Sequence, residues 1–295
     1  MSPLRWTCKS TRKLSDELVQ QGHPVGYRTV ARLLGEELDY SLQSTRKTKE
    51  GRQHPDRDGQ FLHINQRVKT FFKQNQPVIS IDCKKKEKIG DFANAGHEYR
   101  PQGRPEKASA HDFAKEKAIP FGIYDLARNT GWVNVGTDHE TAQFAVESIR
   151  RWWRYVGRIA YPKADKLLVV ADGGGGNGSR VRLWKVELQR LANKLGLPIA
   201  VSHFPPGTSK WNKIEHRMWN HVTANWRGRK LVSQEVVVNL IANTTSRNGL
   251  RIKARLDARK YPTKIKVSDE QVAKVNLIPD KYHGRDWNYT IAPST

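Results

Sequence analysis

The distribution of apolar residues predicts two short helices at the start of the chain. The first spans residues 10–21, with Ser10 as its cap, and its apolar face carries Leu14, Leu18 and Val19. After a Gly-His-Pro break, a second helix over residues 27–37 is expected to bury Val30, Ala31, Leu33 and Leu34. Its outward positions are Arg28, Thr29 and Arg32. The pattern is typical of a helix-turn-helix, although an ordinary helix pair produces it too.

A polar segment comes after these helices. Residues 43–60 are nearly devoid of apolar side chains and carry clustered positive charge, so they cannot form a core and are predicted to be a linker. A helical stretch over residues 56–74 repeats apolar positions ahead of the first strand. We therefore assign residues 1–42 to a helix-turn-helix-like region and 43–76 to a basic linker and helix.

The pattern then changes to short apolar runs typical of strands. Strands are predicted at 77–85, 119–126, 131–138, 166–172 and 198–204, and helices at 139–156, 179–195 and 213–226. The resulting order, β-β-β-α-β-α-β-α, predicts an α/β domain over residues 77–228. Residues 229–295 form a basic C-terminal extension whose fold this pattern does not define.

The charge of the chain points to its partner. Its 295 residues include 52 Lys and Arg against 29 Asp and Glu, a formal net charge of +23, which attracts polyanions. We expect DNA and not a membrane, because the sequence has no membrane-length apolar run, no clean basic amphipathic helix and no secretory signal. A cytoplasmic, nucleoid-associated location is expected. Cys8 and Cys83 lack metal-site or redox spacing and are predicted to be reduced thiols.

Three acidic residues stand where the side chains of an α/β sheet would meet. Asp82 and Asp172 lie at the ends of apolar strands, and Glu215 opens the last helix of the domain. Taken singly, each acid is better explained as a helix cap or an ion-pair partner, but the strand order favours a shared site. Three carboxylates repel one another unless cations neutralise them, and such ligands suit Mg²⁺ or Mn²⁺ and phosphodiester chemistry.

Other polar clusters have competing interpretations. The loop DGGGGNGSR, residues 172–180, lacks the Gly-Lys-Ser/Thr ending of a nucleotide-binding loop, so its glycines either admit a DNA backbone or permit positive φ. The KKKEK run at 84–88 either grips phosphates or is a solvated face. Zinc binding by His203, His216 and His221 is disfavoured because His216 and His221 do not share a helix face, and solvent or phosphate contact is expected instead.

With these residues in place, the chain resembles the DDE transposases of bacterial insertion sequences, most closely the Rhodopirellula-type family distantly related to mariner-like elements. The resemblance covers nearly the whole chain through the blocks VISIDCKKKE, LLVVADGGGGNGSR and PPGTSKWNKIEHRMW. It implies a ribonuclease H-like mixed sheet flanked by helices, with Asp82, Asp172 and Glu215 as successive metal-binding catalytic carboxylates for two Mg²⁺ ions, replaceable by Mn²⁺. Family members carry a further segment before the block SPLRWTCKS, so we expect a shortened copy, an isolated domain or an alternative start.

The implied function is metal-dependent phosphodiester hydrolysis at the ends of a mobile element, followed by transfer of the freed 3′-hydroxyl into target DNA. A homodimer or a larger synaptic assembly is compatible with it. DNA contacts are expected from Arg28, Thr29, Arg32, Lys84, Lys85, Lys86, Arg180, Lys210 and Lys213. Two alternatives remain: a catalytically silent or repurposed DNA-binding protein, and another ribonuclease H-like nuclease.

Overall fold

The computed structural model describes residues 8–43, 54–111 and 113–294. The chain divides into two compact units, Met1–Lys49 and Glu50–Thr295, which are described separately. No helix in the described part of the chain is long and apolar enough to cross a membrane. Cys8 and Cys83 are free thiols, as predicted.

The smaller unit contains α1 (Thr11–Gln20), α2 (Tyr27–Arg32) and a π-helical turn, η1 (Leu33–Glu37). The Ser10 hydroxyl accepts a hydrogen bond from the Lys13 amide, which confirms the predicted cap. Val30 is buried, but Ala31 and Leu33 are exposed, so the predicted burial of those two was wrong. Within their unit, two short helices have little but each other to pack against, and few positions are enclosed.

The predicted linker ends earlier than expected. Most of residues 43–60 lie outside the described residues, but α3 (Arg57–Lys73) already includes the last four of them. Gln60 is fully buried, and its side chain donates to the His203 carbonyl (2.8 Å). The helix predicted over residues 56–74 is therefore α3, and its first turn replaces the end of the predicted linker and packs on the rest of the larger unit.

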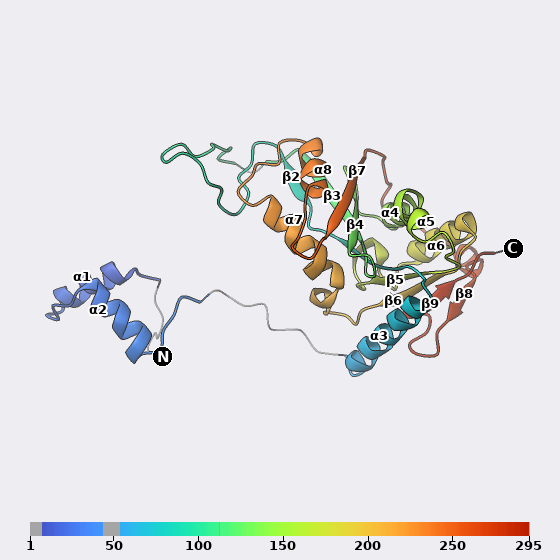
Figure 1. Ribbon diagram of the computed structural model, residues 1–295, viewed down its shortest axis with the longest axis horizontal. Helices are drawn as coiled ribbons and strands as arrows, with labels where there is room; N and C mark the ends of the chain where they lie inside the picture. The colour runs from blue at the N-terminus through green and yellow to red at the C-terminus, as the bar shows by residue number, and fades with distance from the viewer. Residues whose placement is uncertain (1–7, 44–53, 112, 295) are drawn as a thin grey trace. The chain divides into compact units, whose positions relative to one another are not determined.

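The larger unit is built on a nine-stranded mixed sheet in the described part of the chain (Figure 1). Its order is β7-β4-β3-β1-β5-β6-β9-β8, with β2 paired to β3 outside this path. The strands are β1 (Val78–Cys83), β2 (Glu87–Ile89), β3 (Glu116–Asp125), β4 (Thr130–Gly136), β5 (Leu167–Ala171), β6 (Ile199–His203), β7 (Arg251–Asp257), β8 (Leu277–Pro279) and β9 (Asn288–Ile291). β1, β5 and β6 run parallel, whereas β3 is antiparallel to both β1 and β4.

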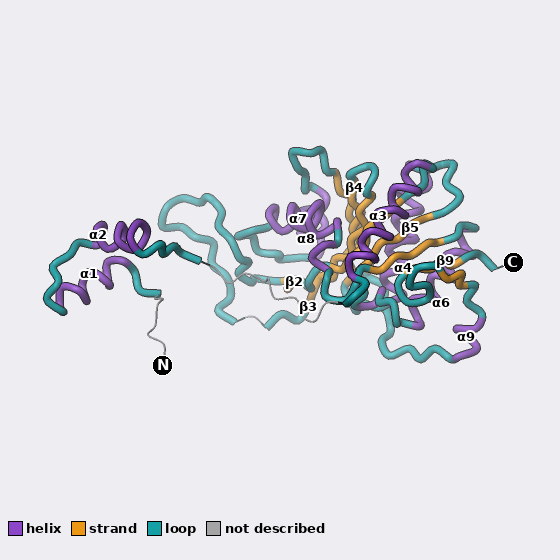
Figure 2. The backbone as a smooth tube through the Cα atoms, turned by 90° about the horizontal axis from the view of Figure 1, so that it is seen from below, coloured by secondary structure: helices purple, strands orange, loops and turns teal. Residues whose placement is uncertain are grey.

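Helices cover both faces of this sheet (Figure 2). One face carries α4 (Ala142–Trp152) and α6 (Arg182–Leu195) on a core that includes Ile81, Phe121 and Trp184. On the other face, α3 packs over β1, β5 and β6, while η5 (Glu215–Trp219), α7 (Asn220–Asn225) and α8 (Gln234–Ala242) cover β3, β4 and β7. An antiparallel β1-β3-β4 meander extended by parallel β5 and β6 is the predicted ribonuclease H-like arrangement.

Several predicted boundaries shift. The helix expected at 139–156 is α4 followed by η2 (Trp153–Gly157) and α5 (Arg158–Ala160), and the helix expected at 213–226 is η5 followed by α7. α6 begins at Arg182 and not at Ser179, because the glycine loop contains its own 3₁₀ turn, η3 (Gly175–Asn177). A second 3₁₀ turn, η4 (Ser209–Trp211), precedes η5.

The C-terminal residues belong to the same compact unit as the α/β domain. β7 pairs in parallel with β4, and β9 pairs antiparallel with β6, so residues from 251 onward extend both sides of the sheet (Figure 1). α9 (Asp269–Ala273) lies between β7 and β8 in the chain. The boundary expected at residue 228 therefore does not separate two compact units, since the extension completes the sheet by hydrogen bonding to its strands.

Candidate active site

Asp82 and Asp172 occupy equivalent positions on neighbouring parallel strands. Ile81 of β1 is paired with Ala171 of β5, and each is followed directly by one of the two aspartates. Because the carboxyl ends of parallel strands meet at one edge of a sheet, both side chains reach the same crevice. Both residues are half-buried.

Glu215 begins η5 and is tied to β1 by a buried hydrogen-bond network. The Asn212 side-chain amide donates to the Ile81 carbonyl (2.9 Å), and the Ser80 hydroxyl donates to Asn212 Oδ1. The Glu215 amide in turn donates to the Asn212 carbonyl (3.1 Å). Asn212 is almost fully buried, so this network fixes the start of η5 against the strand that carries Asp82.

A glycine opposite Asp82 allows η5 to pack directly on the sheet. Gly122 of β3 is the register partner of Asp82. A Cβ atom at Gly122 would lie 2.4 Å from Trp219 Cζ2 and 2.6 Å from Met218 Cε, both on η5. The absence of a side chain at this position therefore sets how closely the segment bearing Glu215 approaches β3.

Burial and neighbouring carboxylates raise the pKa of both Asp82 and Asp172. Burial, the charge of Asp172 and a hydrogen bond and charge interaction with Glu215 raise the pKa of Asp82 to about 9. Burial also raises the pKa of Asp172, as does the charge of Glu215, against hydrogen bonds from the Asn177 side chain and the Gly174 amide. The structure thus gathers the three acids that the sequence analysis selected.

These acids suit a divalent cation in their chemistry. Carboxylate oxygens are hard ligands, and a cation would relieve the repulsion that raises the pKa of Asp82. Within the described ranges, however, no three His, Cys, Asp or Glu side chains are already arranged as a set that could hold an ion. The donors match Mg²⁺ or Mn²⁺ in kind.

Glu140 is a fourth acid beside the site, which the sequence analysis did not select. It hydrogen-bonds with the Cys83 side chain and the Gly176 amide, and burial is the main cause that raises its pKa. A Cβ at Gly175 would lie 2.5 Å from Glu140 Oε1. Glu140 therefore links the glycine loop to β1. Glu140 lies shortly after a predicted strand, and this position could have marked it as a candidate. The sequence analysis instead assigned it to the helix predicted at 139–156.

The glycine loop has the backbone freedom that its composition indicated. Gly175 has a φ of +62°, a conformation that favours glycine, which supports the positive-φ interpretation at this position. Beside the loop lies a cavity of about 510 Å³, whose wall includes Asp172, Ser179, Arg180, Ser209 and Trp287. The cavity adjoins one acid of the site and offers polar groups, a cation and an aromatic ring.

The expected phosphate-binding residues divide into two sets. Most have exposed side chains: Arg28, Thr29 and Arg32 on α2, and Lys85, Lys86, Arg180, Lys210 and Lys213 around the crevice. Lys84 differs, because it pairs with Glu87 (2.6 Å) and lies over the Trp226 ring (4.9 Å from the centroid). Because its ammonium already has partners inside the protein, we expect Lys84 to contribute less to DNA binding than the exposed cations.

The three histidines considered as zinc ligands have different surroundings. His203 is fully buried and its ring faces the Asp172 carbonyl and the Tyr289 hydroxyl, so the expected solvent or phosphate contact was wrong. His216 and His221 lie on the helical segment after Glu215, and the His216 ring contacts the Lys210 carbonyl.

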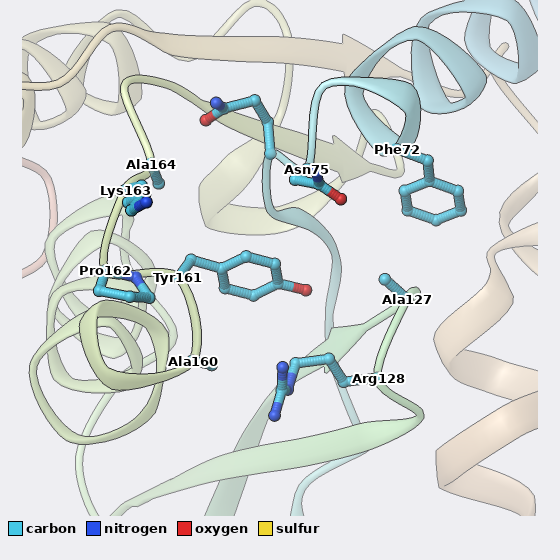
Figure 3. A pocket seen from close by; sticks show the side chains of 10 residues that line it. Phe72, Asn75, Ala127, Arg128, Ala160, Tyr161, Pro162, Lys163 and Ala164 are labelled. Atoms are coloured by element: carbon cyan, nitrogen blue, oxygen red, sulfur yellow. The ribbon is translucent and has the colours of Figure 1, made fainter.

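Figure 3 shows a second cavity, of about 320 Å³, whose lining includes none of the three acids. Tyr161, Arg128 and Asn75 contribute to its wall, and the Tyr161 hydroxyl lies 2.9 Å from both carboxylate oxygens of the buried Asp125. Asp125 is paired with Ile79 near the start of β1, whereas Asp82 is near its end. This cavity therefore belongs to the opposite edge of the sheet.

Comparison with known proteins identifies the class to which this fold and site belong. The family model described as Rhodopirellula transposase DDE domain matches residues 1–293, so the chain belongs to that family of transposase DDE domains. No curated protein matches the chain.

Solved structures similar to the chain include complexes of the Mos1 transposase. The Mos1 paired-end complex with the left transposon end is 12% identical, with a TM-score of 0.44 over 80% of this chain and 70% of that one. The Mos1 strand transfer complex is 13% identical, with a TM-score of 0.42 over 80% and 69%.

Proposed function

We propose that this chain is a DNA transposase that cuts the ends of a mobile element and joins the freed 3′-hydroxyl to target DNA at the nucleoid. Asp82, Asp172 and Glu215 are its catalytic carboxylates. The observation that carries the proposal is that Asp172 and Glu215 both lie close enough to Asp82 to raise its pKa, in a member of a transposase DDE family.

Asp82, Asp172 and Glu215 would hold two Mg²⁺ or Mn²⁺ ions, with Mg²⁺ preferred. When bound, such ions activate the attacking oxygen and stabilise the leaving oxygen of a phosphodiester. The chain's own residues orient the carboxylates: Asn212 sets the position of Glu215, and Asn177 donates to the Asp172 carboxylate (3.3 Å). Glu140 restrains the glycine loop after Asp172 through its hydrogen bond with the Gly176 amide.

The surface around the crevice is suited to a DNA backbone. Lys85, Lys86, Arg180, Lys210 and Lys213 provide exposed cations, and Trp211 is 48% exposed with the Lys210 ammonium over its ring. Cations neutralise phosphates, and an exposed indole can stack on a base. In the smaller unit, Arg28, Thr29 and Arg32 on α2 would contact the ends of the element, and a homodimer or larger assembly would hold two ends together.

The test compares Asp82→Asn, Asp172→Asn and Glu215→Gln with the wild type. Each should abolish Mn²⁺-dependent nicking and strand transfer on labelled DNA that carries the element ends, while DNA affinity changes little because cations supply most of the binding. Asp58→Asn, at a side chain 86% exposed on α3, is the matched control and should retain both activities.

Three outcomes would contradict parts of this proposal. Full cleavage by any one variant removes that acid from the triad. Binding by the wild type without nicking favours a silent or repurposed DNA-binding protein. Nicking without strand transfer favours another ribonuclease H-like nuclease.

A further inference from the structure

His203 is the last residue of β6 and lies beside the point where the chain leaves β5 for the glycine loop. β5 and β6 are parallel, and Ala171 is paired with His203. The His203 ring is therefore next to Asp172, and its Nδ1 atom lies 3.1 Å from the Asp172 carbonyl oxygen. The ring is fully buried, so water does not compete for this contact.

A chain of hydrogen bonds fixes which ring nitrogen carries the proton. The Trp184 indole N–H can only donate, and it donates to the Tyr289 hydroxyl oxygen (2.9 Å). The Asp172 carbonyl can only accept, so His203 Nδ1 carries the hydrogen. His203 Nε2 then accepts from the Tyr289 hydroxyl (3.1 Å). Every group has one role, and Trp184, Tyr289 and His203 all have no exposed surface.

The backbone of His203 is held from two other directions. Its amide donates to the Trp287 carbonyl (2.8 Å), and its carbonyl accepts from the Gln60 side chain (2.8 Å). Gln60 also accepts from the Asn288 side chain (2.7 Å), which closes a link between α3 and β9. The backbone that carries the ring is therefore held by Gln60 of α3 and by Trp287, directly before β9.

The position of this support matters because the segment directly after Asp172 is made of glycine. Residues 173–176 are four consecutive glycines, which have more backbone freedom than any other residue type. The Asn177 side-chain amide contacts both the Asp172 carboxylate (3.3 Å) and, at a longer distance, the Asp172 carbonyl (3.4 Å), but Asn177 lies beyond those glycines in the chain. A hydrogen bond to the Asp172 carbonyl restrains the backbone of Asp172 before the glycine segment begins.

We propose that His203 is a positioning residue that holds Asp172 in place through its carbonyl oxygen, in a single ring tautomer set by Trp184 and Tyr289. The inference rests on the proposed function, because it assigns this support to a catalytic carboxylate. It makes β9, which supplies Tyr289, a required part of the active site. Burial lowers the pKa of His203 to about 4, which agrees with a neutral ring.

Two substitutions of His203 test the contacts of its two ring nitrogens separately. In His203→Asn the amide group reaches the position of Nδ1 and keeps a donor for the Asp172 carbonyl. In His203→Gln the amide reaches the position of Nε2, so the contact with Tyr289 is kept and the donor to Asp172 is lost. Tyr289→Phe removes the hydroxyl and leaves Nε2 and the Trp184 indole without their partner.

The main readout is the affinity of the full chain for Mn²⁺ in the absence of DNA. It is measured by the decrease of the EPR signal of free Mn²⁺ as the ion binds. Residues that orient metal ligands typically change affinity by roughly 10–100-fold when removed. We expect a loss of about that size for His203→Gln, with a parallel fall in kcat for nicking, and a much smaller loss for His203→Asn. Equal Mn²⁺ affinity in wild type and His203→Gln would overturn the proposal.

Asn134→Ala controls for general destabilisation. Asn134 is fully buried and donates to Ser148 and Asp257, away from the three acids. At a matched fall in Tm, this variant should bind Mn²⁺ as the wild type does. If it loses as much affinity as His203→Gln, the role of His203 is purely structural.

The tautomer of His203 can be measured independently of metal binding and catalysis. Imidazole ¹⁵N NMR of the wild type, with His203 assigned by its loss in His203→Asn, should show a protonated Nδ1 and a hydrogen-bonded, unprotonated Nε2. The opposite tautomer overturns the proposal even if the protein is active. A wild type that neither binds Mn²⁺ nor nicks DNA instead overturns the proposed function, and with it the purpose assigned to His203, even where NMR shows this tautomer.

Discussion

The Asn212 side chain and the Ile81 carbonyl are joined by a 2.9 Å hydrogen bond that connects the segment before Glu215 to the strand carrying Asp82. This contact makes the spacing of two acids depend on a neutral amide. Asn212 lies three residues before Glu215 and is 1% exposed, so its own access to a substrate is negligible. We therefore expect Asn212 to affect catalysis only by fixing the position of Glu215 relative to Asp82.

We predict that Asn212→Ala lowers nicking by about 10²-fold, the size associated with small misplacements of catalytic groups. It should also reduce the free energy of unfolding by about 1–3 kcal/mol, because Ser80 and the Ile81 carbonyl lose a buried partner. Nicking assays and urea unfolding measure the two effects. Asn220→Ala, at an exposed position on α7, should change neither, and full activity of Asn212→Ala would show that Glu215 is positioned by other contacts.

Gly122→Ala should disturb the packing of η5 on the sheet. Its new Cβ would sit 2.4 Å from Trp219 Cζ2, so η5 has to shift or Trp219 has to change its rotamer. We expect a cost of about 1–3 kcal/mol in stability and a clear fall in nicking rate. Gly35→Ala, where nothing lies within 4 Å, should leave both unchanged. Unaltered Tm in Gly122→Ala would mean that this surface repacks freely.

Variants at Glu140 distinguish two possible roles of this residue, a hydrogen-bond restraint on the glycine loop and a negative charge beside the site. Glu140→Gln keeps an acceptor for the Gly176 amide but removes the negative charge, whereas Glu140→Ala removes both. If Glu140 acts by restraining the loop, the alanine variant should lose much more nicking activity than the glutamine variant. Equal losses in the two variants would instead show that the charge itself is needed, and single-turnover nicking rates resolve the difference.

DNA binding should weaken steeply as salt rises, because each neutralised phosphate releases counterions. Replacing Lys213 or Arg180, whose side chains are exposed, by Ala should reduce the slope of log K against log salt by about 1 each. Lys84→Ala is the matched comparison and should leave the slope unchanged, since its ammonium pairs with Glu87. The measurement is fluorescence anisotropy across a salt series. A slope lowered equally by Lys84→Ala would restore Lys84 to the interface.

Acid should loosen the attachment of β7. Burial opposes the charged form of Asp257, but hydrogen bonds from Arg259, Tyr261 and Asn134 and the charge of Arg151 outweigh it and hold its pKa well below the usual range. A carboxyl with a lowered folded-state pKa stabilises the fold above its unfolded-state value, near 4, and this stability is lost as pH falls below it.

We therefore expect Asp257→Asn to be destabilised by about 3–5 kcal/mol at pH 7, because Arg151 and Arg259 lose a buried partner. The difference from wild type should shrink as pH falls through 4. Thermal unfolding between pH 3 and pH 7 tests this, and Asp269→Asn, at a side chain 90% exposed, serves as the control. A difference that stays constant with pH would rule out the titration of Asp257 as its cause.

The local pattern of the chain was sufficient to predict the centre of the sheet. β1 and β5 are buried apolar runs, and such runs report their own burial without reference to distant residues. The positions of Asp82 and Asp172 at strand ends were read from the same runs. The parallel pairing of these strands then placed the two acids side by side.

The features that the local pattern missed depend on contacts between distant parts of the chain. β7 is an edge strand that exposes most of its side chains, so the sequence RIKARLD has no apolar run by which to recognise it. Lys84 lies two residues after Asp82 in sequence, yet its ammonium is held by Glu87 and the Trp226 ring. The sequence by itself determined the central strands of the sheet, β1, β3, β4, β5 and β6, and selected Asp82, Asp172 and Glu215 as candidate acids. The roles of Asn212, Glu140 and His203 were decided by tertiary structure, because a buried polar side chain is defined by partners far away along the chain.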